Sequence, residues 1–454
     1  MKTKEIIEKL QKRFPNEPEY IQAVEQVLIT IEDEYNKHPE FDKCNLIERL
    51  CIPDRIYSFR VTWIDDKGKV QNNMGYRIQF NNAIGPYKGG IRFNKNVNLS
   101  ILKFLGFEQT FKNALTTLPM GGAKGGSDFD PHGKSDGEIM RFCQAFITEM
   151  YRFIGENEDV PAGDLGVGGR EVGYMFGMYK KLTHQFTGSF TGKGLEMGGS
   201  LMRSEATGYG NVYFMENMLR NHGDSLEGKS AIVSGAGNVA QYTVEKLLLE
   251  DVKVLTMSDT SGVLYIASGY TRPILEEIKD WKTTQHKSLK EYYEKNEKEN
   301  PQRIYDWTFN DDVKFAWTIK ADLVLPSATQ NEIDGEDAKK LIDNDIIAVS
   351  EGANMPSTPE AVRVFQQAKI LYAPGKASNA GGVAVSGLEM SQDSIRLSWT
   401  KEEVDIKLQS IMRDIHDNCV KYGVQQDGYV DYVKGANVTG FLKVSKAMMM
   451  QGVI

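Results

Sequence analysis

The chain has 454 residues, of which 41% are hydrophobic and 26% are charged. This is an ordinary globular composition, long enough for about two to three domains, and it excludes a disordered, collagenous or coiled-coil protein. The net charge of −8 provides no overall attraction to nucleic acid or to an anionic membrane, although it leaves room for a local basic pocket that binds a small anion.

The first part of the chain has the pattern of a mixed α/β domain. Residues 57–63 and 70–80 alternate between apolar and polar side chains and flank the turn signal Asp65-Asp66-Lys67-Gly68, which predicts a hairpin. Helical periodicity follows over about 99–115, 137–154 and 170–182. The tract from 188 to 210 then holds seven glycines, which indicates a domain boundary and a hinge.

Beyond this tract the pattern changes to short apolar runs, most of them separated by helical segments. Buried parallel strands in βαβ units look like this. The runs are 231–233, 252–257, 322–325, 346–349 and 370–372. The charged tract 287–303 predicts a solvated helix or loop, and the methionine-rich, helix-periodic residues 441–454 are expected to pack back on the first domain. We therefore expect one domain over 1–200, joined by 426–454, and a second over 201–425.

The cysteines and the N-terminus favour a soluble, cytoplasmic protein. Cys44, Cys51, Cys143 and Cys419 include no C-x-x-C pair and are too sparse for a disulfide scaffold, so we expect them to be reduced. Residues 1–10 are charged and lack the apolar core of a signal peptide, and no window reaches the ~18 apolar residues of a membrane span.

A glycine-rich turn after the run 231–233 indicates a dinucleotide site. Gly235, Gly237 and Ala240 form G-x-G-x-x-A between a predicted strand and a predicted helix. The first glycine permits the tight turn, the second lets the backbone approach a pyrophosphate, and the alanine allows close helix packing. The helix N-terminus offers unpaired N–H groups to that anion. Alone, the pattern also fits a plain glycine-rich βα turn.

Polar loops at the ends of the later strands strengthen this interpretation, because ligands of open parallel sheets bind at the carboxyl ends. These loops are Ser327–Asn331, Glu351–Asn354 and Pro374–Asn379. Asp259 ends the second strand, where a carboxylate pairs with a free ribose 2′-hydroxyl and favours NAD. Nearby hydroxyls and bases would instead suit a 2′-phosphate, although each alone is more simply a solvated side chain. They are Ser258, Ser261, Arg272, Lys279, Lys282 and Lys287.

Three lysines in the first domain indicate an anion pocket. Lys88 and Lys124 are flanked by glycines, which leave room for a ligand. Gln109 precedes Lys112 by three residues and so lies on the same helix face, where an amide beside an ammonium suits a carboxylate. The alternative is that these lysines are solvated surface charges, with Lys112 paired to Glu108 four residues earlier.

Asp164, in the glycine-rich loop Val160–Gly169, is either a turn former or a proton-transfer group that faces the lysines. A lysine that is partly desolvated and flanked by other cations has a lowered pKa and can act as a base near neutral pH. The six histidines show no metal-ligand spacing, and no H-E-x-x-H, G-x-S-x-G or P-loop motif occurs, so we expect no metal site.

Four motifs, in order around the dinucleotide turn, resemble the small hexameric glutamate dehydrogenases of the Glu/Leu/Phe/Val dehydrogenase family. They are Pro86–Phe93 (PYKGGIRF), Gly121–Gly126 (GGAKGG), Pro161–Gly169 (PAGDLGVGG) and Asn379–Gly387 (NAGGVAVSG). The resemblance covers about residues 50–454. It implies an α/β fold with a mixed α/β substrate domain, a Rossmann-like domain, a C-terminal helix that returns to the first domain, and a cleft that closes between the domains.

The resemblance also implies residue roles. Lys88 would bind the distal carboxylate of the substrate with Ser386 from the second domain. Gln109 and Lys112 would hold the α-carboxylate, with a backbone contact from Gly163. Lys124 would activate water and stabilise the carbinolamine, and Asp164 would move protons to and from the amine. The cofactor contacts would include Thr207, Gly235, Gly237, Asn238, Asp259 and Asn354.

The expected reaction is the reversible oxidative deamination of L-glutamate to 2-oxoglutarate and ammonia, with a role in ammonium assimilation by a cytoplasmic homohexamer. Members whose second strand ends in Ser-Asp-Ser/Thr more often look NADP-dependent, so we favour NADP(H) over the NAD(H) that the ribose rule suggests. Val385 stands where many members have Thr, and we expect a modest packing change there. The alternatives are a dehydrogenase of a branched-chain or aromatic amino acid, and a catalytically silent dinucleotide-binding protein. No nucleic acid or membrane partner is expected.

Overall fold

The computed structural model describes residues 3–454, which form two compact units. The first unit comprises the chain as far as Leu201 together with Ala384–Val404 and Asn437–Ile454, and the second comprises Met202–Val383 and Asp405–Ala436. This division differs from the expected one over 1–200, 201–425 and 426–454, because Ala384–Val404 groups with the first unit and residues 426–436 group with the second. Ser386 was expected in the second domain and instead belongs to the same unit as Lys88.

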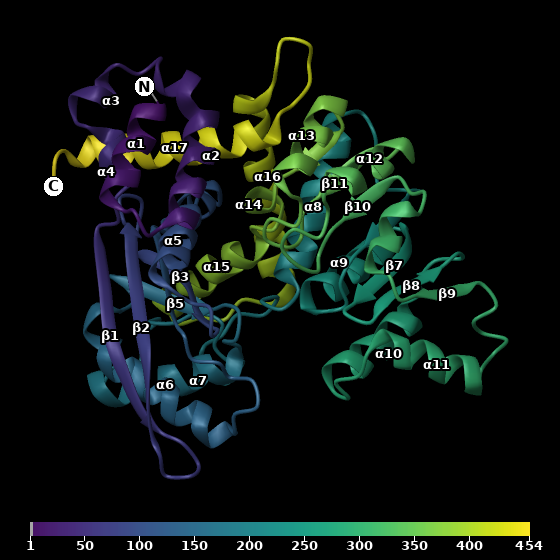
Figure 1. Ribbon diagram of the computed structural model, residues 1–454, viewed down its shortest axis with the longest axis horizontal. Coiled ribbons are helices and arrows are strands. Elements are labelled where there is room, and N and C mark those ends of the chain that lie inside the picture. Colours follow the sequence, from purple (N-terminus) through teal and green to yellow (C-terminus); the bar gives the residue numbers. More distant parts are fainter. Residues whose placement is uncertain (1–2) are drawn as a thin grey trace. The chain divides into compact units, whose positions relative to one another are not determined.

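A five-stranded mixed sheet forms the centre of the first unit, in the order β1-β2-β4-β3-β5 (Figure 1). Its strands are β1 (Arg55–Ile64), β2 (Val70–Asn81), β3 (Tyr87–Phe93), β4 (Gly122–Ser127) and β5 (Asp159–Gly163). β1 and β2 form the predicted antiparallel hairpin, β2 is antiparallel to β4, and β3 runs parallel to both β4 and β5.

The glycine-flanked segments that contain Lys88 and Lys124 are strands, and the first part of the expected glycine-rich loop Val160–Gly169 is strand β5. Their glycines are required by packing between backbones. A Cβ on Gly89 would lie 1.7 Å from the Ala123 carbonyl oxygen. Glycine-rich strands lack the alternation of side chains by which strands are recognised, so the sequence pattern did not reveal them.

Helices cover both faces of this sheet. An aromatic core that includes Phe93, Phe142 and Phe146 lies on the face of α6 and α7, and α5 packs on the opposite face, where Leu102 approaches Gly126. The predicted helices at 99–115, 137–154 and 170–182 correspond to α5 (Leu99–Leu115), α6 (Asp136–Met150) with η1 (Tyr151–Phe153), and α7 (Gly169–Thr183). The other elements of this part are α1 (Thr3–Arg13), α2 (Pro18–Tyr35), α3 (Glu40–Lys43), α4 (Leu46–Leu50) and η2 (Leu195–Met197).

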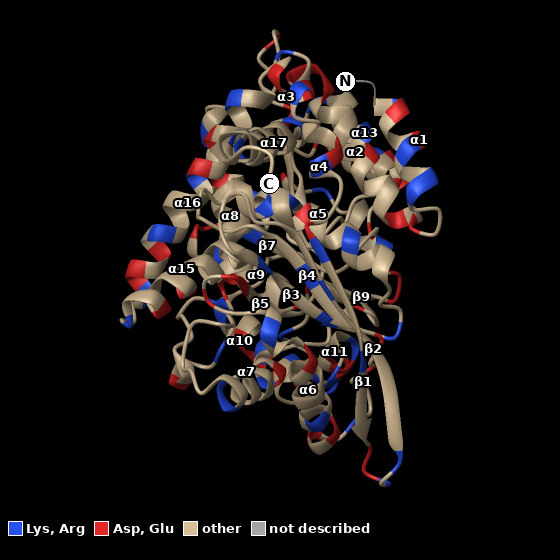
Figure 2. Ribbon diagram, turned by 90° about the vertical axis from the view of Figure 1, so that its left-hand side faces the viewer, with Lys and Arg blue, Asp and Glu red and all other residues tan. Residues whose placement is uncertain are grey.

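The C-terminal helix α17 (Tyr432–Gln451) packs on the N-terminal helices, as expected, and lies near α2 in Figures 1 and 2. The ring of Phe441 lies 5.7 Å from that of Phe41 and 6.1 Å from that of Tyr35. The Asn437 side chain donates a hydrogen bond to Thr30 Oγ1 at 2.8 Å. α17 follows α15 (Gly381–Ile395) and α16 (Lys401–Gly423).

The second unit contains a seven-stranded sheet of order β12-β11-β10-β6-β7-β8-β9. The five predicted strands are confirmed as a parallel set: β6 (Ser230–Val233), β7 (Lys253–Asp259), β10 (Leu323–Leu325), β11 (Ala348–Ser350) and β12 (Leu371–Ala373). Two antiparallel strands that were not predicted, β8 (Gly262–Ile266) and β9 (Trp307–Asn310), extend one edge.

The helices of this unit pack on both faces of its sheet. Ser350 of β11 faces α8, where it donates to Asn211 Oδ1 at 2.5 Å, whereas the neighbouring Val349 lies in a core with Leu341 of α12 and Phe365 of α13. The helices are α8 (Ala206–Asn221), α9 (Asn238–Leu249), α10 (Arg272–Thr283), α11 (Leu289–Glu299), η3 (Val313–Thr318), α12 (Gly335–Asp343), α13 (Pro359–Ala368) and α14 (Gly375–Ser378).

Acidic and basic residues are interspersed along the outer helices, as on α1 and α16 in Figure 2. None of the helices within residues 3–454 combines the length and the apolar character that crossing a bilayer requires. The four cysteines are unpaired, as expected, and three of them are buried.

Candidate active site

Strand register brings the predicted catalytic residues of the first unit to one face of its sheet. β3 pairs in register with both β4 and β5, so Gly90 lies between Lys124 and Ala162. Because side chains alternate between faces along a strand, Lys88 and Lys124 project from the same face, and Asp164 continues that face beyond β5. A Cβ on Gly90 would lie 2.8 Å from the Asp164 Cβ, so glycine at this position permits the two strands to hold Lys124 and Asp164 close together.

Lys124 and Asp164 form an ion pair that includes a third residue, Arg92. Lys124 Nζ lies 3.0 Å from Asp164 Oδ1, and Arg92 Nε donates to Asp164 Oδ2 at 2.7 Å. The Lys124 side chain is 6% exposed and that of Asp164 is 18% exposed. Arg92 lies in the sequence motif Pro86–Phe93, but only the structure shows that its side chain reaches Asp164.

The pKa values of this pair follow from burial and from the neighbouring charges. Burial lowers the pKa of the Lys124 ammonium, and the positive charges of Arg92 and Arg77 lower it further, against the opposing effect of Asp164. Burial alone raises the pKa of Asp164, but the charges of Lys124 and Arg92 outweigh it and lower that pKa to about 2. A lysine that loses its proton readily therefore lies beside a carboxylate that stays ionised.

Asn113 of α5 connects the predicted substrate-binding residues. Its amide donates to the backbone carbonyl of Lys88 at 3.0 Å and accepts from Gln109 Nε2 at 2.6 Å. Lys88 is 1% exposed, whereas Gln109 and Lys112 are partly exposed on α5. Asn113, which no sequence motif singles out, therefore links the strand of Lys88 to the helix that carries Gln109 and Lys112.

Two further hydroxyl groups belong to this unit. Ser386, on α15, is 2% exposed, and the adjacent Gly387 packs against Met120, just before β4. The backbone N–H of Thr191 donates to the Pro161 carbonyl of β5 at 3.0 Å, and its buried hydroxyl has no hydrogen-bond partner in the structure. Buried polar groups are normally satisfied, so the Thr191 hydroxyl is a candidate ligand contact that no sequence motif indicated.

In the second unit, the glycine-rich turn has the geometry that a dinucleotide requires. Gly235 has φ +89°, in the region that favours glycine, and a Cβ on Gly237 would meet nothing within 4 Å. Gly237 is the N-cap of α9, and no side chain caps the N–H groups of that helix. These residues therefore fit a pyrophosphate, because the backbone is accessible and its first-turn donors have no side-chain acceptor.

The other predicted cofactor residues lie in the same unit. Asn238 begins α9 and donates through Nδ2 to the Ser204 carbonyl at 2.8 Å. Thr207 lies in the first turn of α8, and its Oγ1 would be 2.5 Å from a Cβ on Gly382. Asn354, in the loop after β11, accepts from Asn379 Nδ2 at 2.9 Å.

Asp259 is already engaged by protein groups. Oδ2 accepts from Lys282 Nζ at 2.6 Å and from the Leu289 backbone N–H at 2.9 Å, while Oδ1 accepts from the Ser261 N–H at 2.9 Å. The hydroxyl of Ser258 accepts from the Gly235 N–H at 2.8 Å and so supports the turn. Both oxygens of Asp259 thus have donors, and its charge is paired with that of Lys282.

No group of three or more His, Cys, Asp and Glu side chains within residues 3–454 is arranged to hold a metal ion.

Comparison with known proteins identifies relatives along the whole chain. Residues 198–452 match the family model described as Glutamate/Leucine/Phenylalanine/Valine dehydrogenase, and residues 53–181 match the Glu/Leu/Phe/Val dehydrogenase dimerisation domain. The NAD(P)-specific glutamate dehydrogenase of Xylanibacter ruminicola is 66% identical over 453 residues, and the NAD-specific glutamate dehydrogenase of Bacteroides fragilis is 59% identical over 454 residues. Both alignments cover 100% of each chain.

Other relatives are named NADP-specific glutamate dehydrogenases. Among solved structures, a glutamate dehydrogenase of Plasmodium falciparum superposes with a TM-score of 0.95 at 47% identity, over 100% of this chain and 95% of that one.

Proposed function

The chain belongs to the Glu/Leu/Phe/Val dehydrogenase family, and from this premise we propose that it catalyses the reversible oxidative deamination of L-glutamate to 2-oxoglutarate and ammonia. The observation that carries the proposal is the buried contact of 3.0 Å between Lys124 and Asp164, on the sheet face from which Lys88 also projects. A doubly negative substrate requires two cationic subsites, and Lys88 and Lys112 supply them.

The residues around the pair can bind both carboxylates of the substrate and perform the proton transfers that this reaction needs. Lys88 with Ser386 and Thr191 binds the distal carboxylate, and Lys112 with Gln109 and the Gly163 backbone binds the α-carboxylate.

A bound nicotinamide would supply the acceptor for the hydride that leaves Cα of glutamate. Lys124, in its neutral form, then removes a proton from the water that attacks the resulting imine, and its ammonium form stabilises the carbinolamine. Asp164 transfers protons to and from the departing nitrogen, while Arg92 holds its carboxylate in position.

The cofactor half of the site is proposed to use Gly235, Gly237 and Asn238 for the pyrophosphate, with Thr207 and Asn354 nearer the nicotinamide. NADP(H) is the proposed cofactor, with NAD(H) as the alternative, since relatives bear both names. The pairing of Asp259 with Lys282 supports NADP(H), because a neutralised carboxylate repels a 2′-phosphate less and offers the 2′-hydroxyl no free acceptor.

The enzyme is further proposed to act as a cytoplasmic homohexamer in ammonium assimilation. Its unpaired cysteines support a reducing compartment. The outer face of the hairpin β1–β2 supports self-association, because Ile56, Ile64, Val70 and Met74 are exposed there.

Initial rates with 2-oxoglutarate and ammonium test the proposal. The wild-type enzyme is expected to oxidise NADPH faster than NADH, and to prefer glutamate to leucine in the reverse direction.

Lys124→Ala is expected to lower kcat by at least about 10³-fold, because it removes the base, while cofactor binding followed by fluorescence is unchanged. Lys88→Leu shifts the preference toward apolar amino acids. Normal turnover by Lys124→Ala would refute the assignment of the base, and a faster rate with leucine than with glutamate in the wild type would favour the dehydrogenase of an apolar amino acid.

A further inference from the structure

A buried arginine crosses the sheet beneath the strand that carries Lys124. Arg77 lies on β2, and both its side chain and that of Asp159 on β5 are completely shielded from solvent. The guanidinium donates from Nε to Asp159 Oδ2 at 2.9 Å and from Nη2 to Asp159 Oδ1, and Nη1 donates to the Gly89 carbonyl of β3 at 3.0 Å. Arg77 therefore connects β2 with β3 and β5, although β4 separates β2 from both in the sheet.

This pair, which we call the Arg77–Asp159 brace, passes directly under β4. Arg77 is paired with Gly125 across the two strands. A Cβ on Gly125 would lie 3.2 Å from Arg77 Cδ and 3.3 Å from Nη1, so the glycine leaves the space that the arginine occupies. Gly125 follows Lys124 in β4, and the brace consequently lies on the face opposite to the Lys124 side chain.

Stability alone is a weak reason for such a brace. Removing two charges from water costs free energy that their attraction often fails to recover, and well-packed apolar residues commonly stabilise as much. The brace nevertheless has a complete set of partners, since Gln79 Nε2 also donates to Asp159 Oδ2 at 3.0 Å. What an apolar pair could not supply is a fixed positive charge and bidentate hydrogen bonds that link separate strands.

We propose that Arg77 is a positioning residue for the reaction: it holds β3, β4 and β5 in the register that keeps Lys124 against Asp164, and it fixes a positive charge beneath Lys124. The inference rests on the proposed function, because it assigns the brace a role in the proton transfers between these two residues. The geometry supports it directly, since the brace contacts β3, adjoins β4 beside Lys124, and anchors the first residue of the strand that leads to Asp164.

The direction of the expected pH effect follows from the charges around Lys124. The titratable and charged groups on the elements packed against β4 are Tyr76 and Arg77 on β2, Tyr87, Lys88 and Arg92 on β3, Lys103, Glu108 and Lys112 on α5, and Asp159 and Asp164 on and after β5. Of these, Asp164 raises the pKa of Lys124, whereas Arg92 and Arg77 lower it. Loss of the Arg77 charge therefore raises that pKa, and the base becomes available only at higher pH.

The test compares the wild type with Arg77→Met/Asp159→Asn, which removes both charges together so that neither is left buried and unpaired. We measure kcat, KM and the pH profile for glutamate oxidation, with rates normalised to the number of folded sites by cofactor-binding stoichiometry. We expect kcat to fall about tenfold with KM changed less than about twofold, and the acid limb of the kcat profile to move up less than in Arg77→Met alone, because the double variant also removes the opposing charge of Asp159.

A matched control removes another buried pair of the same unit, Lys103 and Glu17, whose side chains are 0% and 14% exposed. Lys103→Met/Glu17→Gln is expected to change the melting temperature and leave the pH profile in place. Arg77→Lys keeps the charge but not the bidentate contact, so it should return the acid limb toward the wild-type position without restoring kcat.

If the double variant does not fold, Gly125→Ala tests the brace, because its methyl group would lie 3.2 Å from Arg77 Cδ, as well as 3.1 Å from the Tyr76 carbonyl oxygen, and points away from Lys124. Unchanged kcat and pH profile in the folded double variant, or in Gly125→Ala, would overturn the inference. Failure of the proposed function is distinguishable, because the wild type itself would then show no turnover of glutamate.

Discussion

Lys124, Asp164 and Asp259 show how partners determine the chemistry of single charged residues. Lys124 is buried beside a carboxylate and between cations, which favours loss of its proton, while Asp164 remains ionised at every physiological pH. Asp259 has the residue type of a ribose ligand, yet Lys282 and the N-terminus of α11 engage its oxygens. The two carboxylates thus differ in their partners: Asp164 lies beside the candidate base, whereas Asp259 is paired with Lys282.

The pairing of Asp259 with Lys282 yields a prediction about cofactor choice. In Lys282→Met the Asp259 carboxylate loses its cation, and its uncompensated charge repels the 2′-phosphate of NADPH. We expect kcat/KM for NADPH to fall about tenfold, with that for NADH changed less than about twofold.

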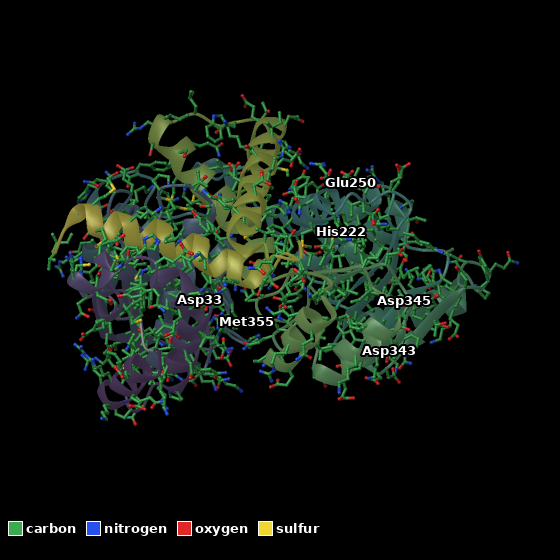
Figure 3. The ribbon with its side chains drawn as sticks, turned by 90° about the horizontal axis from the view of Figure 1, so that it is seen from above. Asp33, His222, Glu250, Asp343, Asp345 and Met355 are labelled. Atoms are coloured by element: carbon green, nitrogen blue, oxygen red, sulfur yellow. The ribbon has the colours of Figure 1, made fainter. Side chains whose placement is uncertain are left out.

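The control is Lys320→Met, at an exposed pair with Asp345 in the same unit, where the side chains are 74% and 79% exposed. Figure 3 labels Asp345 near Asp343, the last residue of α12. Equal losses with both cofactors in Lys282→Met would contradict the prediction.

At the scale of elements, a buried charge cluster fastens α15 to the glycine-rich segment before α8. Lys193 Nζ lies 2.8 Å from Glu389 Oε1 and 2.7 Å from Asp393 Oδ2, and Glu389 also accepts from the Gly192 N–H at 2.8 Å. One cation therefore serves two carboxylates. Burial raises the pKa of Asp393 to about 6, and this effect outweighs the opposing charge of Lys193. The helix that carries Ser386 is thus held by a cluster that is sensitive to pH.

The raised pKa of Asp393 predicts that the stability of the folded protein falls as the pH rises. Since its pKa is higher in the folded protein than the ordinary value of 3.8, its contribution to stability is complete below about pH 3.8 and is lost as the pH rises through about 6. Asp393→Asn does not titrate. From pH 5 to pH 7.5 we therefore expect the wild type to lose about 1 kcal/mol of unfolding free energy relative to Asp393→Asn, as measured by urea unfolding.

The matched variant for this experiment is Asp136→Asn, at a pair with Arg170 in which the aspartate is 74% exposed. The difference in unfolding free energy between Asp136→Asn and the wild type should stay constant from pH 5 to pH 7.5. A constant difference for Asp393→Asn as well would show that Asp393 does not titrate in the folded protein.

At the scale of the whole molecule, the proposed self-association is assigned to the edge strand β1. Phe59, Val61 and Trp63 of β1 face the core, so Ile56 and Ile64 project outward and are 41% and 50% exposed. In Figure 2 the charged residues of the hairpin gather near its turn, and much of its length is uncharged. An exposed, partly apolar edge strand is a liability in a monomer and a natural contact between copies of a chain.

Ile64→Lys tests this surface, because a lysine on an edge strand opposes pairing with another strand. We expect the variant to form smaller assemblies than the wild type in size-exclusion chromatography with light scattering. Leu397→Lys, at a 66% exposed leucine of the same unit outside the sheet, should leave the assembly unchanged. A wild-type monomer, or an unaltered assembly in Ile64→Lys, would argue against β1 as the contact.

The sequence by itself determined the class of fold, the five parallel strands of the second unit, the dinucleotide turn and the identity of the candidate lysines. Each has a local signal: an apolar run, a glycine at a tight turn, or a cation between glycines. The tertiary structure decided what depends on register and on neighbours distant in the chain. It showed that the glycine-flanked segments of Lys88 and Lys124 are strands and that Ser386 belongs with Lys88. It also showed that Arg92 reaches Asp164 and that Asp259 is paired with Lys282. The reason is physical: pKa, accessibility and reach depend on groups that lie close in space, and spacing along the chain does not specify which groups those are.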